Sequence, residues 1–387
     1  MRDEGAKGKA KRGTRPTSRT APARKSSRPS ATPNEFDFIK HIRQRAHKQA
    51  AAIARSSSAL SPQPSALIGI GDDAAVIAQH DERETVITTD LLVEDIDFRR
   101  ATMPARALGH KALAISLSDI AAMGARPRWA LLSVGVPADV WRTRFLNDFY
   151  AGFFALAART GVALIGGDVS RTPERIVIDS IVLGEVQSGC AVLRSGARAG
   201  DQIFVTGALG GAAAGLHILE DKTRLGRAKT AARIASTRPQ TRARAQLIKR
   251  QQQPEPRLGW GALLGAQQLA SALIDLSDGL SSDLAHLCRA SGVGALVEAA
   301  RLPIDPRLAQ IDINESDALN FALHSGEDFE LLFTVPPQHV ARLPEELDGV
   351  PVTRIGEIRP RRAGLKIISA GRARTLQPAG FTHFHAK

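Results

Sequence analysis

Cysteine and aromatic residues are scarce in this chain of 387 residues, and long uncharged apolar runs are absent. The two cysteines, Cys190 and Cys288, exclude a disulfide scaffold and a zinc site built from cysteines, and such a low content is typical of a reducing cytosol. Aromatic residues make up only 4% of the chain, so stacking platforms for single-stranded nucleic acid are not expected. No run of about 18 apolar residues is free of charge, so no transmembrane helix is expected. Together these absences predict a cytoplasmic protein.

Several common phosphate-binding and metal-binding motifs are also missing. The chain has no G-x-x-x-x-G-K-[ST] sequence, which excludes a P-loop. It also lacks the protein-kinase motif set and a His-Glu-x-x-His metal-binding spacing. Residues 69–74 fit the loose dinucleotide pattern G-x-G-x-x-A, but two carboxylates in that turn would repel a pyrophosphate. The glycine-rich residues 206–211 resemble a nucleotide-binding turn, and we interpret them as close packing between a strand and a helix.

The net charge of +13 is concentrated in two segments. Residues 1–34 hold ten Lys and Arg side chains against two carboxylates, and residues 221–257 hold eleven against two, so the rest of the chain is mildly acidic. Residues 1–34 cannot bury enough apolar surface to offset chain entropy, which predicts a disordered tail. A solvated tail, a weak nucleic-acid-binding tail and a mitochondrial-type address all remain open for it. Residues 221–257 are predicted to be a helical insertion or a mobile connector.

The remaining chain has the composition of a large globular protein, with 43% hydrophobic residues, and we predict a mixed fold of the α/β or α+β class. After the tail we expect an N-terminal domain over 35–187 and a C-terminal domain over 188–387. The expected strands are 66–70, 85–89, 130–136, 176–183, 202–206, 271–276, 294–297, 329–335, 352–357 and 365–368. The expected helices are 36–56, 105–123, 140–160, 207–219, 259–272, 281–291 and 317–322.

Aspartates follow or interrupt apolar stretches at five points of the chain. The six informative carboxylates are Asp73, Asp90, Asp119, Asp168, Asp275 and Asp278. Carboxylate and hydroxyl oxygens are hard ligands that suit Mg²⁺ shared with substrate phosphates. Six carboxylates in one cleft could not all stay ionised without cations between them, so their convergence would imply several divalent ions and polyphosphate chemistry. Any one aspartate could instead be a helix cap or a turn residue, but five such motifs together favour the metal site.

Seven motifs, in order, resemble the thiamine-monophosphate kinase family, within the superfamily of aminoimidazole ribonucleotide synthetase and selenophosphate synthetase. They are GIGDDAAVI, ITTDLLVEDIDF, KALAISLSDIAAMGA, LIGGDVSR, LRSGARAGDQIFVTG, IDLSDGLSSDL and SGEDFELLF. The resemblance covers about residues 36–387, without the basic tail and much of residues 221–250. It implies a homodimer in which the N-terminal domains pair into a β-barrel, and a C-terminal α/β sandwich. The implied reaction is Mg²⁺-dependent, direct in-line transfer of phosphate from ATP to thiamine monophosphate, giving thiamine diphosphate.

The resemblance also assigns roles to matching positions of this chain. The implied Mg²⁺ ligands are Asp73, Thr88, Thr89, Asp90, Asp119, Asp168, Asp275 and Asp278. The implied ATP contacts are Tyr150, Gly167, Asp168, Arg194 and Ser277, and the implied substrate contacts are Asp97, Glu327 and Phe381. Asp97 departs from the family, in which many members have His. A cationic thiazolium between the carboxylate of Glu327 and the ring of Phe381 is physically reasonable. Tyr150 and Phe381 could also be core residues, and Arg194 a surface arginine.

Two other functions compete with the kinase. A selenophosphate synthetase would carry a reactive cysteine in a glycine-rich N-terminal segment, and neither Cys190 nor Cys288 lies in one. A nucleic-acid-binding protein would use the two basic segments, and its affinity would fall steeply with salt. Without a recognition motif or interleaved aromatic residues, nucleic-acid binding is at most an accessory property of the tail.

Overall fold

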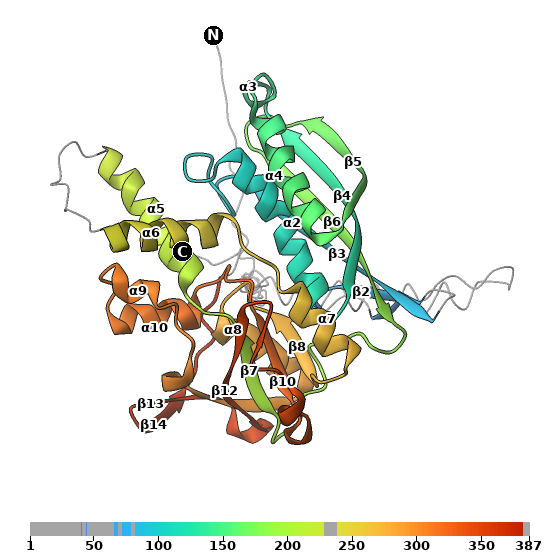
Figure 1. Ribbon diagram of the computed structural model, residues 1–387, viewed down its shortest axis with the longest axis vertical. Coiled ribbons are helices and arrows are strands. Elements are labelled where there is room, and N and C mark those ends of the chain that lie inside the picture. Colours follow the sequence, from blue (N-terminus) through green and yellow to red (C-terminus); the bar gives the residue numbers. More distant parts are fainter. Residues whose placement is uncertain are drawn as a thin grey trace, which may run out of the picture.

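The computed structural model describes residues 66–68, 72–78, 82–227 and 238–381, with Lys40 and Gln44 as isolated positions (Figure 1). The predicted tail over 1–34, nearly all of the predicted helix over 36–56 and the middle of the basic segment 221–257 lie outside the described residues. None of the helices in the described ranges is long and apolar enough to cross a membrane.

The first sheet has six strands in the described part of the chain, in the order β1-β2-β3-β6-β4-β5. They are β1 (Ala66–Ile68), β2 (Ala75–Ala78), β3 (Arg83–Val93), β4 (Arg126–Val136), β5 (Ala163–Arg171) and β6 (Val177–Gln187). β4 and β5 pair in parallel, and the other neighbours are antiparallel. Within the described residues β1 and β5 form the two edges, so this sheet is open. Four of its strands were expected, whereas β2 and β5 were not. In β5, glycines and polar residues hide the alternation that would predict a strand.

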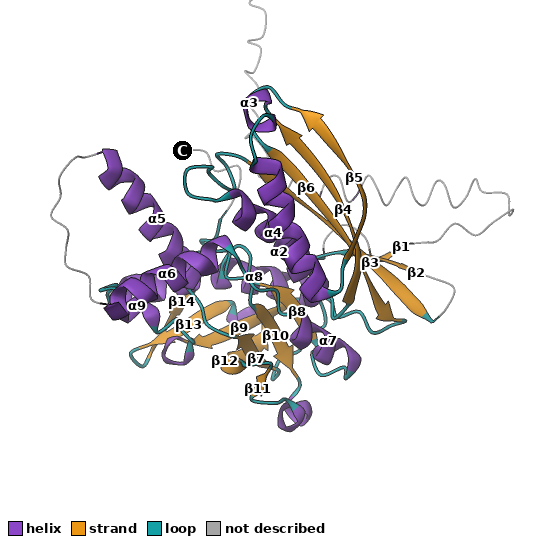
Figure 2. Ribbon diagram, turned by 45° about the horizontal axis from the view of Figure 1, so that its top comes forward, coloured by secondary structure: helices purple, strands orange, loops and turns teal. Residues whose placement is uncertain are grey.

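Helices α2 (Ala105–Ala122) and α4 (Phe145–Thr160) cover one face of this sheet (Figure 2). They cross closely because two glycines leave no side chain between them. A Cβ atom on Gly109 would lie 1.8 Å from the Phe149 carbonyl oxygen, and one on Gly152 would lie 1.8 Å from the Arg106 carbonyl oxygen. This close packing holds α2 between α4 and the sheet, and so fixes the position of Asp119 on α2.

The second sheet follows the order β14-β13-β9-β12-β7-β10-β8, with β11 paired to β12. Its strands are β7 (Gln202–Thr206), β8 (Ala272–Asp275), β9 (Val293–Glu298), β10 (Leu331–Val335), β11 (Glu346–Leu347), β12 (Val350–Pro360), β13 (Leu365–Ser369) and β14 (Arg372–Thr375). Its helices are α5 (Gly211–Arg227), α6 (Arg238–Gln252), α7 (Leu258–Ala266), α8 (Leu280–Ser291), α9 (Arg307–Gln310) and α10 (Glu315–His324). Alternate residues of β8 enter different cores on its two faces, which explains its continuous apolar sequence.

Three predicted helices differ from the structure. The helix expected over 140–160 is two helices, α3 (Ala138–Trp141) and α4, because the Thr143 hydroxyl accepts a hydrogen bond from the Phe145 amide and starts a new helix. The helix expected over 259–272 ends at Ala266, where the chain turns back into β8. The helix expected over 207–219 begins at Gly211, after a turn in which Gly207 has a φ of 59°. A Cβ atom on Gly207 would lie 2.2 Å from the Glu330 carboxylate, in agreement with a packing role for this glycine-rich turn.

Candidate active site

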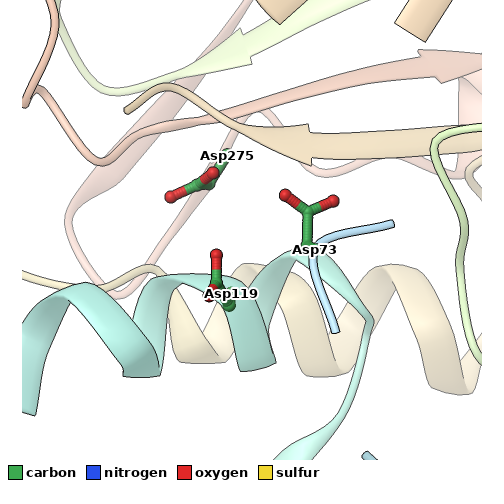
Figure 3. A group of neighbouring side chains, drawn as sticks. All are labelled: Asp73, Asp119 and Asp275. Carbon is green, nitrogen blue, oxygen red and sulfur yellow. The ribbon is translucent and has the colours of Figure 1, made fainter. Parts of the chain in front are cut away.

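Three aspartates from distant parts of the chain lie close together beside helix α2 (Figure 3). Asp73 precedes β2, Asp119 lies in the last turn of α2, and Asp275 ends β8. One carboxylate oxygen of each lies within 4.8 Å of the others. Asp73 and Asp275 are buried, and Asp119 is half-buried. This arrangement brings half of the six predicted carboxylates into a single cluster.

Hydroxyl groups hold these carboxylates in place. Thr88 Oγ1 of β3 donates to Asp119 Oδ2 at 2.5 Å, and Ser118 Oγ of α2 donates to Asp275 Oδ2 at 2.7 Å. Asp90 of β3 accepts a hydrogen bond from Ser116 and interacts electrostatically with Asp73. The second Asp90 oxygen, Oδ2, is buried and has no hydrogen-bond partner among the described residues. A buried carboxylate oxygen without a donor is the arrangement that a cation would complete.

Burial makes the ionised form of these carboxylates costly. Burial, reinforced by Asp73, raises the pKa of Asp275 from 3.8 to about 8. Burial, with Asp179 and Asp73, also raises the pKa of Asp90 to about 6. The pKa of Asp119 is raised well above its usual value, first by burial and then by Asp90 and Asp275. The cluster therefore concentrates negative charge that requires compensation from cations.

Arg194 supplies part of that compensation. Its Nε and Nη2 atoms donate to the two oxygens of Asp73 at 2.8 and 2.6 Å, forming a bidentate ion pair. Its backbone amide donates to the Asp72 carboxylate at 3.3 Å. Asp72 thus anchors the arginine, whereas Asp73 faces the cluster, as expected for neighbouring residues that point opposite ways. Among the described residues, no hydrogen bond is formed by the Nη1 group of Arg194, so it could bind an anionic ligand.

A cavity of about 550 Å³ extends from Asp90. Five other predicted site residues lie in its wall: Asp97, Ser277, Asp278, Glu327 and Phe381. Apolar side chains complete the wall, among them Met103, Ile115 and Phe329. The cavity wall therefore combines carboxylates with apolar side chains, a lining that suits an organic substrate.

Backbone contacts fix several of the predicted residues in this wall. The Phe381 amide donates to the Asp278 carbonyl oxygen at 3.2 Å, which brings the C-terminal segment to the turn between β8 and α8. The Glu327 amide donates to the Ser277 carbonyl oxygen at 2.8 Å. Asp97 Oδ2 accepts from the Val93 amide at 2.7 Å and closes the turn after β3. Residues that are far apart in sequence thus form one continuous surface.

Four predicted residues lie outside the cluster and the cavity wall: Asp168, Gly167, Thr89 and, described below, Tyr150. Asp168 and Gly167 are exposed on the edge strand β5, and Thr89 is exposed on β3 with its Oγ1 donating to Asp179 at 2.6 Å. Asp168 is paired with Ser133 of β4, and Ser133 is paired with Asp179 of β6. The neighbouring row, which contains Leu132 and Ser180, is buried under the helices, so Asp168 points to the uncovered face of the sheet. Only glycine fits at position 167, because a Cβ atom on Gly167 would lie 2.0 Å from the Leu132 carbonyl oxygen.

Tyr150 lies on α4 and packs against the core of the first sheet. Its ring centroid is 5.5 Å from that of Phe149 and 6.1 Å from that of Phe154. Burial raises the pKa of its hydroxyl. Tyr150 thus packs on the core but stays half-buried, and its contact with ATP remains a prediction.

The motif reasoning missed two side chains beside the cavity, Lys111 and Gln251. Lys111 Nζ lies 2.5 Å from Glu327 Oε1, and Gln251 Nε2 lies 2.6 Å from Glu327 Oε2. The available signal was a lysine followed directly by the apolar residues 112–115 of α2. Its partner could not be identified, because Glu327 is more than two hundred positions away in the chain.

Another missed feature is a buried ion-pair group behind the cavity. Arg257 binds the Glu330 carboxylate with two hydrogen bonds, at 2.6 and 2.5 Å, and Arg250 donates to the same carboxylate at 3.2 Å. Asp328 accepts from the Gly210 and Ala212 amides and caps α5. Two acidic residues of the sequence SGEDFELLF are therefore structural, and Glu327 is the one that reaches the cavity.

Two family models match most of the chain. The model of the AIR synthase related protein N-terminal domain matches residues 71–186, and that of the AIR synthase related protein C-terminal domain matches residues 198–367. Thiamine-monophosphate kinase of Escherichia coli (strain K12) is 40% identical over 321 residues, which are 82% of this chain and 92% of that protein. Thiamine-monophosphate kinase of Bacillus subtilis (strain 168) is 35% identical over 82% of this chain and 93% of that protein.

Solved structures have the same fold. AaThiL complexed with AMPPCP and TMP superposes with a TM-score of 0.70 at 28% identity, covering 91% of this chain and 97% of that chain. Thiamine-monophosphate kinase from Stenotrophomonas maltophilia K279a gives a TM-score of 0.64 at 35% identity, covering 86% and 96%. Hydrogenase maturation protein HypE shares the fold alone, with a TM-score of 0.56 at 18% identity, covering 76% of this chain and 88% of that chain.

Proposed function

The chain belongs to the thiamine-monophosphate kinase family, and we propose that it phosphorylates thiamine monophosphate with ATP, forming thiamine diphosphate and ADP. The observation that carries the proposal is the cluster of Asp73, Asp119 and Asp275 beside a cavity whose wall holds both carboxylates and apolar side chains. The relative complexed with AMPPCP and TMP supports a site for two phosphorylated molecules.

The residues of the cluster fit Mg²⁺. All donors are carboxylate or hydroxyl oxygens, and the buried Oδ2 of Asp90 has no hydrogen-bond partner among the described residues. Asp73, Asp90, Asp119 and Asp275 would hold the metal, with Thr88 orienting Asp119 and Asp278 lying close by in the cavity wall. When bound, Mg²⁺ neutralises phosphate charge and polarises the transferred phosphoryl group.

The chain's own residues position the two substrates. An acceptor phosphate oxygen of thiamine monophosphate forms a bond to the γ-phosphorus of ATP while the bond between that phosphorus and the β,γ-bridging oxygen breaks, and ADP leaves. No side chain acts as a covalent nucleophile in this direct transfer. Arg194, held by Asp73, would offer its Nη1 group to phosphate oxygens, and Ser277 in the cavity wall would contact ATP. Catalysis then depends on alignment and charge neutralisation.

The organic part of thiamine monophosphate is proposed to bind in the cavity. Glu327, Asp97 and Phe381 lie in its wall, and the Phe381 ring is 48% exposed, so it can stack on a flat ring. A carboxylate and an aromatic face together suit a cationic thiazolium.

We also propose that the protein is a homodimer, paired through the uncovered face of the first sheet. Leu91 and Trp129 point to this face and are exposed, at 59% and 36%. A second copy would cover this face and join the two open sheets into a barrel. The proposed domain boundary lies near residue 187, between the two sheets, and a cytoplasmic location fits the low cysteine content.

An assay with purified protein, ATP and thiamine monophosphate tests the function, with products separated by chromatography. Thiamine diphosphate should form with Mg²⁺ and not with EDTA.

Asp275→Asn should lower kcat/KM by about 1,000-fold or more, because one carboxylate of the metal site becomes neutral. Asp139→Asn is the control, since Asp139 is 71% exposed on α3. The proposal is wrong if the folded protein forms no thiamine diphosphate, and the metal assignment is wrong if Asp275→Asn retains full activity.

A further inference from the structure

Lys111 is a fully buried lysine on α2, with an exposed fraction of 0%. Burying an ammonium group is costly unless it is paired and hydrogen-bonded. Its Nζ atom lies 2.5 Å from Glu327 Oε1 and 3.4 Å from the Gln251 carbonyl oxygen. The lysine thus joins α2 both to the loop that follows α10 and to the end of α6.

Glu327 is held on both of its oxygens. Lys111 binds Oε1, and the Gln251 side chain donates to Oε2 at 2.6 Å. Each carboxylate oxygen has two lone pairs, so these contacts leave acceptor capacity on the side facing the cavity. The Glu327 side chain is 30% exposed and lies in the cavity wall, so a ligand can reach it.

The backbone around Glu327 is also constrained. Glu327 has a φ of 68°, in the left-handed region, and its amide is bound to the Ser277 carbonyl oxygen. A Cβ atom on the preceding Gly326 would lie 2.1 Å from that same oxygen. On the other side, Phe329 is buried in the core of the first sheet. The protein therefore maintains an unfavourable backbone conformation that presents one carboxylate to the cavity.

α2 connects this carboxylate to the aspartate cluster. Lys111 and Asp119 lie eight residues apart on one helix, which corresponds to about 12 Å along its axis. One rigid helix thus fixes the spacing between the cluster and Glu327.

We infer that Lys111 and Gln251 are positioning residues that hold the Glu327 carboxylate in the orientation that binds the organic part of the acceptor substrate. The inference rests on the proposed function, because thiamine monophosphate is taken as that substrate. Lys111 does not itself line the cavity, so it acts through Glu327. Gln251 does line the cavity, but its amide is directed to the same carboxylate.

Kinetics of four variants test this role. Lys111→Met and Glu327→Gln should each raise the KM for thiamine monophosphate about tenfold or more, while the KM for ATP stays within about twofold. Lys111→Arg should restore most of the affinity, because it keeps the charge. The double variant Lys111→Met/Glu327→Gln should be no worse than Glu327→Gln alone, since the lysine acts through the glutamate. Arg159→Met is the matched control, because it breaks an exposed ion pair with Glu255 away from the cavity.

Calorimetric titration with thiamine monophosphate separates this inference from the proposed function. If the wild-type protein neither binds nor phosphorylates thiamine monophosphate, the function is wrong and the inference fails with it. If the wild type is active but Lys111→Met binds thiamine monophosphate with unchanged affinity, or if both KM values rise equally, only the inference is overturned. Should Lys111→Met fail to fold, Gln251→Leu decides: a selective rise of about threefold or more in the thiamine monophosphate KM supports the inference, and an unchanged KM overturns it.

Discussion

The carboxyl group of Asp275 ends strand β8 inside the protein, where burial and Asp73 raise its pKa to about 8. The pKa of Asp90 is raised to about 6, again chiefly by burial. In an unfolded chain both groups would titrate near 3.8. Between these values the folded protein binds protons that the unfolded chain releases, so stability decreases as pH rises, by up to about 1.4 kcal/mol per pH unit for each group.

We therefore expect the metal-free protein to have a higher Tm at pH 6 than at pH 8. Mg²⁺ should raise Tm more at pH 8, because the ionised carboxylates bind it without losing protons. Scanning calorimetry at constant ionic strength, with EDTA or Mg²⁺, measures both effects. In Asp275→Asn the pH dependence should be weaker, and an equal pH dependence in this variant would contradict the assignment of the high pKa to Asp275.

At the scale of single elements, α2 determines the geometry of the site. It carries Lys111, Ser118 and Asp119, which reach Glu327, Asp275 and the cluster respectively. A helix fixes these side chains relative to one another more precisely than a loop would. Its own position depends on α4, which it meets at the two glycines.

Gly109→Ala should accordingly disturb the site from a distance. The added Cβ atom would lie 1.8 Å from the Phe149 carbonyl oxygen, so the helices must separate, at an expected cost of about 3 kcal/mol in the free energy of unfolding. Gly161→Ala is the control: Gly161 has a φ of 70° and no neighbouring atom within 4 Å, so only about 1 kcal/mol of backbone strain is expected. Urea denaturation measures both variants, and equal losses would contradict the close-packing argument.

At the scale of the whole molecule, the two faces of the first sheet separate the predicted metal ligands. One row of residues across the sheet contains Asp90, Ser180, Leu132 and Gly167, each paired with the next. Ser180 and Leu132, in the middle of this row, are buried. The next row holds Asp168 and points to the uncovered face. Three strand spacings of about 4.8 Å also lie between β3 and β5. Within one chain, Asp168 is therefore remote from the aspartate cluster.

The proposed dimer, paired through the uncovered face, would give Asp168 a role in a site shared between two copies. Asp90→Asn and Asp168→Asn should each be inactive as pure proteins. When the two variants are mixed by co-expression, half of the dimers are mixed and each has one intact site, so activity should recover to about a quarter of wild type. Recovery is measured on tagged, purified mixed protein. If Asp168 acted within its own chain, both sites of every mixed dimer would carry a defect and no activity would return.

The sequence alone determined the family, the mixed α/β class and most of the elements, because apolar periodicity and the seven motifs are local properties of the chain. It also identified the carboxylates of the cluster and six residues of the cavity wall: Asp90, Asp97, Ser277, Asp278, Glu327 and Phe381. The contacts of Glu327 with Lys111 and Gln251, and the Asp73–Arg194 pair, depended on the tertiary structure, since each joins positions at least 76 residues apart. The separation of Asp168 from Asp90 was likewise decided by strand order and face, which no local pattern encodes. Local sequence therefore specified which groups are present, and the packing of α2 between the two sheets decided which of them meet.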